Sequence, residues 1–175
     1  ANQQTHREWI YRQAFHMGKH IIGYEVQKIL SVIDWFKKNH SDVKTAVAGY
    51  HEGRLLAFYA GAVDTRIDAV WVSGYFNSRQ RVWDEPIYRN VHNLLTEFGD
   101  AEIASLIAPR TLVVEHSAIP EYVERSVDPT KPELYSGWEF TGYKGTLKTP
   151  DAQSVADEYA RIEKITKPGF LQGAI

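Results

Sequence analysis

The sequence predicts an α/β fold in which a parallel sheet is flanked by helices, a three-layer sandwich. First, short apolar runs bounded by turn residues are typical of buried strands. Second, helical stretches of about a dozen residues separate these runs, as they do in βαβ units with parallel strands. Third, residues 49–53 stand between an apolar run and a helical run, which is a strand–turn–helix layout.

The amino-terminal quarter is predicted to be helical. Residues Thr5 to Met17 form a first helix, with Thr5 as its N-cap. Gly18 breaks that pattern. Residues Ile21 to Asn39 carry apolar side chains at spacings of three and four, which predicts an amphipathic second helix. Lys37 lies in its last turn, where a cation suits the negative end of the helix dipole.

The hydrophobic period then changes, and strands and helices alternate. The predicted strands are Val43 to Ala48, Ile67 to Ser73 and Thr111 to Glu115. The predicted helices are Glu52 to Val63, Ile87 to Glu97, Ala101 to Ile107 and Ala152 to Ile165, with an irregular stretch at 77–83. Residues 118–150 show no period and are predicted to be an irregular surface excursion. We expect one domain over residues 1–175.

Composition limits the possible partners and cofactors. The 175 residues are 43% hydrophobic, include five Trp and ten Tyr, and carry a formal charge of −2 with both signs interspersed. No run of lysine or arginine predicts a nucleic-acid surface, and no apolar run reaches the roughly 18 residues of a membrane span. The absence of cysteine excludes disulfides and thiolate chemistry. No metal site or cofactor is predicted.

The segment Gly49-Tyr50-His51-Glu52-Gly53 has the spacing of a nucleophile elbow, G-x-S-x-G, after a strand and before a helix. Glycines at 49 and 53 suit a tight turn and close packing of the helix on the strand. The middle position, which carries the attacking hydroxyl in serine hydrolases, is His51. The sequence therefore predicts the scaffold of a hydrolase site without its serine.

Residues 5–117 resemble the central portion of an α/β-hydrolase, most closely the branch of dienelactone hydrolases and acetyl xylan esterases. The resemblance is carried by the segments 5–8, 23–28, 32–36, 49–53, 64–69 and 106–110, which read THRE, GYEVQK, VIDWF, GYHEG, DTRIDA and LIAPR. It implies an α/β-hydrolase fold and, if the protein is active, hydrolysis of a carboxylic ester or lactone.

The resemblance also implies where the catalytic groups fall. The nucleophile position is His51, and the backbone N–H of Glu52 would face an oxyanion. The triad acid should follow the third strand, which makes Glu115 or Glu121 the candidate. The triad histidine and half of the oxyanion hole would lie outside these 175 residues, so we expect a hydrolase that is incomplete at both ends. Its unpaired sheet edges would be covered by further segments or by a partner chain.

Several roles for these residues remain open at this point. His51 could act as a nucleophile, a general base or a metal ligand, or it could be a degenerate elbow residue. Glu115 could orient the His51 ring, or belong to a polar surface turn. Tyr50, Tyr75 and Phe76 could line a pocket, although packing in the core or on the surface is the alternative.

The resulting hypothesis is an α/β-hydrolase relative that lacks standard serine-hydrolase activity. The alternatives are an active ester hydrolase that uses His51 or other residues, and a non-catalytic binding module within a larger assembly. A small ester or lactone is the expected substrate of an active form.

Overall fold

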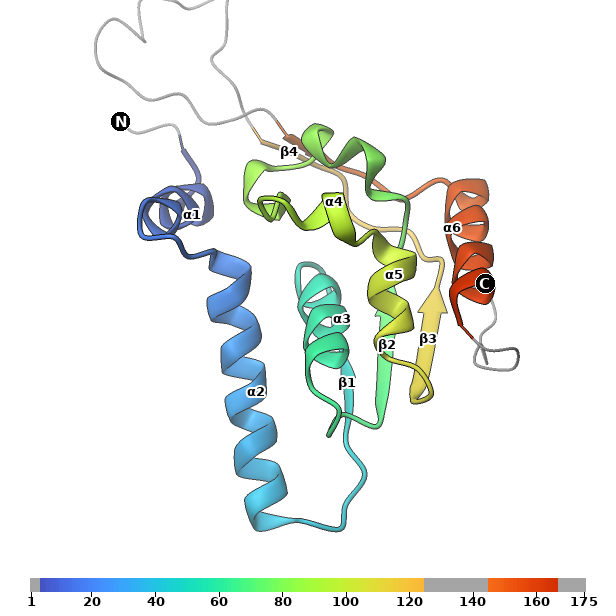
Figure 1. Cartoon of the computed structure of the whole chain (residues 1–175). Coiled ribbons are helices and arrows are strands. Elements are labelled where there is room, and N and C mark those ends of the chain that lie inside the picture. Colours follow the sequence, from blue (N-terminus) through green and yellow to red (C-terminus); the bar gives the residue numbers. More distant parts are fainter. Residues whose placement is uncertain (1–3, 125–144, 167–175) are drawn as a thin grey trace, which may run out of the picture.

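A three-stranded parallel sheet lies at the centre of the molecule, as the sequence predicts. The computed structural model describes residues 4–124 and 145–166. The strands are β1 (Ala46–Ala48), β2 (Ala69–Ser73) and β3 (Thr111–Glu115), and they lie side by side in that order (Figure 1). Both pairs in this sheet are parallel, with Val70 opposite both Val47 and Leu112. The carboxyl ends of the strands therefore meet at one edge of the sheet.

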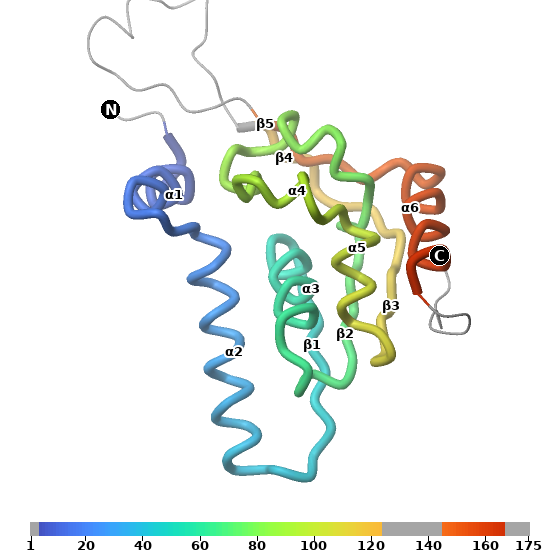
Figure 2. Tube along the Cα trace, in the orientation of Figure 1, coloured from blue at the N-terminus to red at the C-terminus, as the bar shows by residue number. Residues whose placement is uncertain are grey.

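Helices flank this sheet. The helices of the described residues are α1 (His6–His16), α2 (Ile21–Asn39), α3 (Gly53–Val63), α4 (Leu94–Glu97), α5 (Asp100–Ser105) and α6 (Ala152–Ile165), with 3₁₀ turns η1 (Arg79–Asp84) and η2 (Ile87–Arg89). Helix α3 contacts β1 and β2, α2 contacts α3, and α6 contacts α5. Figure 2 shows α3 and α5 on the same side of the sheet.

The core fills the space between the sheet and α3. Val70, Val72, Leu112 and Val114 point to one face, and each is at most 1% exposed. Removing such a side chain from water stabilises a fold by about 1.5–3 kcal/mol. The helix and the sheet approach closely, since a Cβ on Gly61 of α3 would lie 2.2 Å from a methyl carbon of Val70.

The opposite face of the sheet is much less covered by the described residues. Side chains in a strand alternate between faces, so Ala48, Trp71 and Thr111 lie on this second face. All three are exposed, and Trp71 is 50% exposed. Helix α3, which contacts β1 and β2, lies on the face of Val70, because its Gly61 approaches the Val70 side chain.

Several predicted boundaries are confirmed. Helices α2 and α6 and strand β3 have the predicted bounds. Thr5 caps α1 by accepting a hydrogen bond from the Glu8 N–H, and Asp151 caps α6 by accepting from the Ser154 N–H. No helix in the described part of the chain is both long and apolar enough to cross a membrane.

The bounds of two predicted elements differ most from those observed. The helix predicted over 87–97 is divided into η2 and α4, because Asn93 has a left-handed φ of 65°. The strand predicted from Val43 begins only at Ala46. Upstream of it the Val43 carbonyl accepts from Lys37 Nζ and the Thr45 N–H donates to Asp68 Oδ2, so these groups do not join the ladder.

The excursion predicted as irregular also contains structure. Strands β4 (Tyr122–Glu124) and β5 (Gly145–Leu147) form a separate antiparallel pair. Residues 125–144 of this excursion lie outside the described residues. Strands of three residues are too short to show an alternating pattern, so the sequence does not predict them.

Candidate functional site

The turn between β1 and α3 has the geometry of a strained elbow. Strand β1 ends at Ala48 and α3 begins at Gly53. Between them, His51 has a φ of 54°, in the left-handed region that costs an L-residue about 1–2 kcal/mol. The Gly53 N–H donates to the Tyr50 carbonyl at 2.9 Å, which closes the turn. The chain therefore reverses sharply at residue 51.

The two elbow glycines have different roles. A Cβ on Gly49 would lie 1.9 Å from the Gly53 carbonyl oxygen and 2.1 Å from its carbon, so only glycine fits at 49. A Cβ on Gly53 would meet no atom within 4 Å. The spacing predicts that close packing requires both glycines, and the structure corrects this for Gly53.

His51 forms the exposed tip of the elbow, and Glu52 after it is half-buried. The His51 side chain is exposed, and no hydrogen bond or ion pair engages its imidazole within residues 4–124 and 145–166. Neighbouring Tyr50 is 81% exposed. Glu52 is the N-cap of α3, where backbone N–H groups lack partners within the helix. A free imidazole next to a helix amino terminus is the result.

Arg54 fastens this elbow to the end of β2, a role for which the sequence gives no signal. Its Nε donates to the His51 carbonyl at 2.8 Å. Its Nη1 donates to the carbonyls of Ser73 at 3.1 Å and Gly74 at 3.0 Å. The residue is only 5% exposed. Burial, and then the nearby Arg89 cation, lower the pKa of Arg54.

The candidate acid Glu115 lies at the carboxyl end of β3 but has a different partner. Its Oε2 accepts a hydrogen bond from Trp71 Nε1 at 3.2 Å, across the sparsely covered face of the sheet. The described structure contains no hydrogen bond between Glu115 and His51. The other candidate acid, Glu121, is exposed. The role of Glu115 in orienting His51 stays a prediction.

The two residues after Glu115 also have partners. Ser117 Oγ lies 2.7 Å from Ser73 Oγ, which joins the carboxyl ends of β2 and β3. His116 Nε2 lies 2.9 Å from the Pro150 carbonyl oxygen. The carboxyl edge of the sheet thus combines the elbow with several polar side chains, as in other open α/β sheets.

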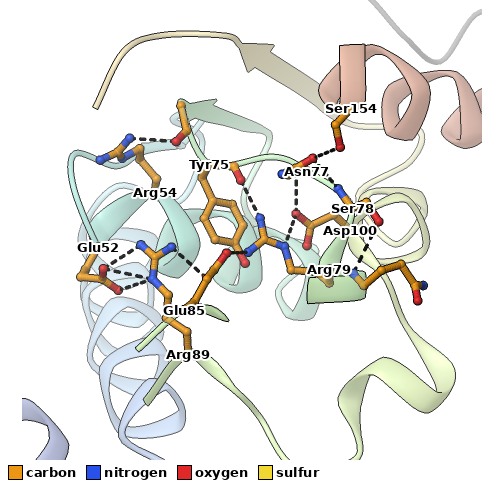
Figure 3. Close-up of polar contacts among 12 residues, drawn as sticks. Glu52, Arg54, Tyr75, Asn77, Ser78, Arg79, Glu85, Arg89, Asp100 and Ser154 are labelled. Carbon is orange, nitrogen blue, oxygen red and sulfur yellow. Dashed lines mark hydrogen bonds and ion pairs between the residues drawn. The ribbon is translucent and has the colours of Figure 1, made fainter. Parts of the chain in front are cut away.

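A chain of charges starts at the half-buried side chain of Glu52 (Figure 3). We call it the buried charge chain, because Arg79, Arg89 and Asp100 are buried. Arg89 Nη2 donates to Glu52 Oε1 at 2.7 Å, and its Nη1 donates to Glu85 at 3.2 Å. Glu85 also accepts from Arg79 Nη1 at 2.9 Å, and Arg79 Nε donates to Asp100 Oδ2 at 3.1 Å. These contacts connect the elbow to the amino terminus of α5.

Burial governs the protonation of this chain. Burial raises the pKa of Asp100 to about 6, although the Arg79 cation and the Asn77 N–H counteract the rise. Burial lowers the pKa of Arg79, but the Asp100 and Glu85 carboxylates outweigh it and raise the pKa overall. Each charge thus depends on an opposite partner, as buried ions do.

Tyr75 and Phe76, both predicted to line a pocket, have different environments. Tyr75 lies beneath two guanidinium groups, with Arg79 4.3 Å and Arg89 5.6 Å from its ring centroid. Burial raises its pKa well above the usual value. Phe76 is 1% exposed and packs edge-on against Phe58 in the core.

A polar cleft opens beside the end of β2. It has a volume of about 190 Å³ and lies between the η1 region, strand β5 and the start of α6. Tyr75 belongs to its lining, together with Arg79 and Arg89 of the buried charge chain. Phe76, Tyr50 and His51 do not line it. Within the described residues no group of three or more acidic or histidine side chains is arranged to hold a metal ion.

Part of this site has a signal in the sequence. Glu85 and Arg89 stand four residues apart, a spacing that favours an ion pair. The long-range contacts of Arg89 with Glu52 and of Arg79 with Asp100 have none, because they depend on how the 75–89 loop folds back over α3. The sequence around Arg54 predicts the start of a helix but gives no sign of the contacts that the Arg54 side chain makes.

The parallel sheet and its flanking helices define an α/β fold. A solved structure with this arrangement is that of a Bacteroides fragilis protein provisionally identified as an acetyl xylan esterase, which superimposes with a TM-score of 0.54 at 18% sequence identity. The match covers 63% of this chain and 33% of that protein, so the chain spans about a third of its length. At this identity the similarity establishes the fold alone.

Comparison at the level of sequence adds nothing to this similarity. No protein-family model matches the chain. No curated protein matches it either.

Proposed function

We propose that this chain is related to carboxylesterases and dienelactone hydrolases, and that it has lost standard serine-hydrolase activity at its elbow. One observation carries the proposal: the elbow turn is complete, yet residue 51 has no hydroxyl. His51 has a φ of 54°, and a Cβ at Gly49 would overlap the Gly53 backbone. The similarity in fold to the Bacteroides fragilis protein supports the kinship.

The chemistry of imidazole explains the expected loss. A serine hydrolase forms an ester on its hydroxyl, and a separate histidine acts as the general base. An imidazole at the nucleophile position forms an acyl-imidazole instead, which hydrolyses readily and needs no triad. No carboxylate in the described residues hydrogen-bonds to His51, so none of them orients or activates its imidazole. The expected rate is therefore that of an unassisted imidazole.

The test is turnover of p-nitrophenyl acetate, a small activated ester, by the purified protein and by the His51→Ala variant. We expect the wild-type rate not to exceed that of free imidazole at equal concentration. Because the chain has seven histidines, His51→Ala removes one imidazole among several and should lower this rate by less than about twofold. His116→Ala is the matched control, because it removes a histidine at the same sheet edge.

A fluorophosphonate probe provides an independent readout, since it labels activated serines. We expect no labelled serine. Labelling of any serine, with turnover above that of free imidazole, would refute the proposal and would reveal a displaced nucleophile.

The second candidate function is ester or lactone hydrolysis by His51 itself. The exposure of its side chain favours this candidate, because a nucleophile must reach its substrate. The backbone N–H of Glu52 would then stabilise the oxyanion. A turnover well above free imidazole that disappears in His51→Ala would support this candidate over the first.

The third candidate is a binding module without catalysis. The exposed Trp71 and its neighbours on the second face of the sheet favour it, since soluble proteins seldom leave such a face uncovered. Further segments or a partner chain would cover this face and the sheet edges.

A further inference from the structure

Arg54 occupies an unusual place for a cation. It is the second residue of α3, close to the positive end of the helix dipole. It is 5% exposed, and the Arg89 cation lies near enough to disfavour its charge. No carboxylate forms an ion pair with Arg54 within residues 4–124 and 145–166. Location, burial and Arg89 disfavour a cation here, and Glu52 and the Tyr50 ring, 6.0 Å from the guanidinium carbon, only partly offset them. A further specific interaction must hold this arginine in place.

Arg54 forms that interaction with backbone carbonyls in two turns, each of which contains a residue with a left-handed φ. Arg54 donates to the carbonyl of His51, which has a φ of 54°. It also donates to the carbonyl of Gly74, which has a φ of 63°. A Cβ on Gly74 would lie 2.7 Å from Arg54 Nη1, so the guanidinium is seated tightly against this second turn.

We infer that Arg54 is the positioning residue of the elbow: its planar guanidinium holds residue 51 in the left-handed conformation and fixes it against the end of β2. Lysine cannot replace it, since an ammonium is a point charge without the planar fork that reaches two turns at once. The inference rests on the proposed function only in taking residue 51 as the site.

The alternative is that Arg54 simply fastens α3 to β2 and leaves residue 51 unaffected. The two roles make different predictions about the backbone. If Arg54 positions the elbow, residue 51 relaxes to negative φ when the guanidinium is removed, because the left-handed conformation is costly for histidine. If Arg54 only fastens the helix, the protein loses stability but residue 51 keeps its conformation.

The experiment measures the backbone conformation of residue 51 by NMR, through its Cα and Cβ chemical shifts and the coupling between its amide and α protons. The proteins are the wild-type chain, Arg54→Met and Arg54→Lys. We expect left-handed values in the wild type and values of negative φ in both variants. Retention of the left-handed values in either folded variant would overturn the inference.

Arg110→Met is the matched control. Arg110 also donates to three backbone carbonyls, those of Asp64, Ile67 and Leu106, at the opposite end of the sheet. Its removal should leave the values at residue 51 unchanged. Failure of the conservative Arg54→Lys variant to fold would also count against the inference, since a residue that only positions the elbow is not needed for the whole fold.

A double-mutant cycle adds a second readout. The substitution His51→Gly removes the cost of the left-handed conformation, so a chain with this change gains nothing when the turn relaxes. Arg54→Met should raise the unfolding equilibrium constant in both backgrounds. The factor of this rise should be smaller in the wild-type background than in the His51→Gly background, by about threefold or more. Equal effects in the two backgrounds would contradict the inference. Neither readout uses esterase activity, so the result is independent of the proposed function.

Discussion

At the scale of single residues, the elbow depends on which positions tolerate a side chain. His51 accepts a strained φ and keeps its imidazole exposed. Gly49 cannot carry a Cβ, because the Gly53 carbonyl lies where that atom would be. Gly53 faces open space. Two glycines that look equivalent in the sequence therefore differ in what the fold requires of them.

This difference is testable by alanine substitution. Gly49→Ala should destabilise the protein by about 2–4 kcal/mol, because the turn backbone must shift to avoid the overlap. Gly53→Ala should be neutral or stabilise the protein by up to about 1 kcal/mol, since alanine favours a helix over glycine. Urea denaturation of the two variants measures both values. A Gly49→Ala variant as stable as the wild type would contradict the elbow geometry.

At the scale of elements, the buried charge chain holds the loop of residues 75–89 between α3 and α5. Arg79 is central, since it donates to Asp100 at the start of α5, to Glu85 and to the Tyr75 carbonyl. Arg89 continues the chain to Glu52. The regular structure of this loop is limited to the short 3₁₀ turns η1 and η2. The ion pairs, rather than a ladder of backbone hydrogen bonds between strands, therefore connect it to its neighbours beside the cleft.

The raised pKa of Asp100 makes stability depend on pH. Burial raises this pKa from 3.8 to about 6, so the folded protein binds the proton more tightly than the unfolded chain. The stabilisation is complete below pH 3.8 and is lost as the pH rises through about 6. At about 1.36 kcal/mol per pKa unit, the effect is roughly 2–3 kcal/mol.

Asp100→Asn isolates this contribution, since asparagine resembles the protonated acid and does not titrate. The free energy lost on substitution should be smaller at about pH 7 than at about pH 4, as measured by urea denaturation at both values. A cost of Asp100→Asn that does not change with pH would contradict the assignment.

Asp64 serves as a contrast, because hydrogen bonds from Arg66 lower its pKa. A group whose pKa is lowered on folding stabilises the protein above its ordinary pKa, and this stabilisation is lost as the pH falls. Asp64→Asn should therefore cost more at about pH 7 than at about pH 3, the opposite direction from Asp100→Asn. The same denaturation series measures it.

At the scale of the whole molecule, the helices cover the sheet unevenly. The face with Val70 and Leu112 is buried, whereas the face with Trp71 is exposed in the described structure. Strands β1 and β3 both have one side without a described partner strand. The exposed Trp71 on the middle strand and the unpaired edges of β1 and β3 favour association with other apolar surfaces.

The 175-residue chain should therefore bind the dye ANS and associate as its concentration rises. Trp71→Lys should reduce both effects, because it places a charge on the exposed face. Trp83→Lys is the control, since Trp83 is 58% exposed in η1 rather than on the sheet. Light scattering and ANS fluorescence provide the measurements. A monodisperse wild-type chain that binds no ANS would show that this face is not a docking surface.

Much of the fold follows from local patterns. The spacing of apolar residues predicts α2, α6 and β3 with their observed bounds, because each element has a regular face toward the core. The helix predicted over 87–97 is wrong, since its division depends on the conformation of Asn93, which periodicity does not reveal. The pair β4 and β5 has no signal, because three residues are too few to show a period.

The sequence by itself determined that a parallel α/β sheet carries an elbow with an imidazole in place of a hydroxyl, because strand and helix periods and the spacing of two glycines are local properties. Only the tertiary structure decided how that elbow is held. Arg54, Arg89 and Asp100 act through partners 19 to 37 residues away in the chain. Such pairings arise when the chain folds back on itself, and no local pattern encodes them.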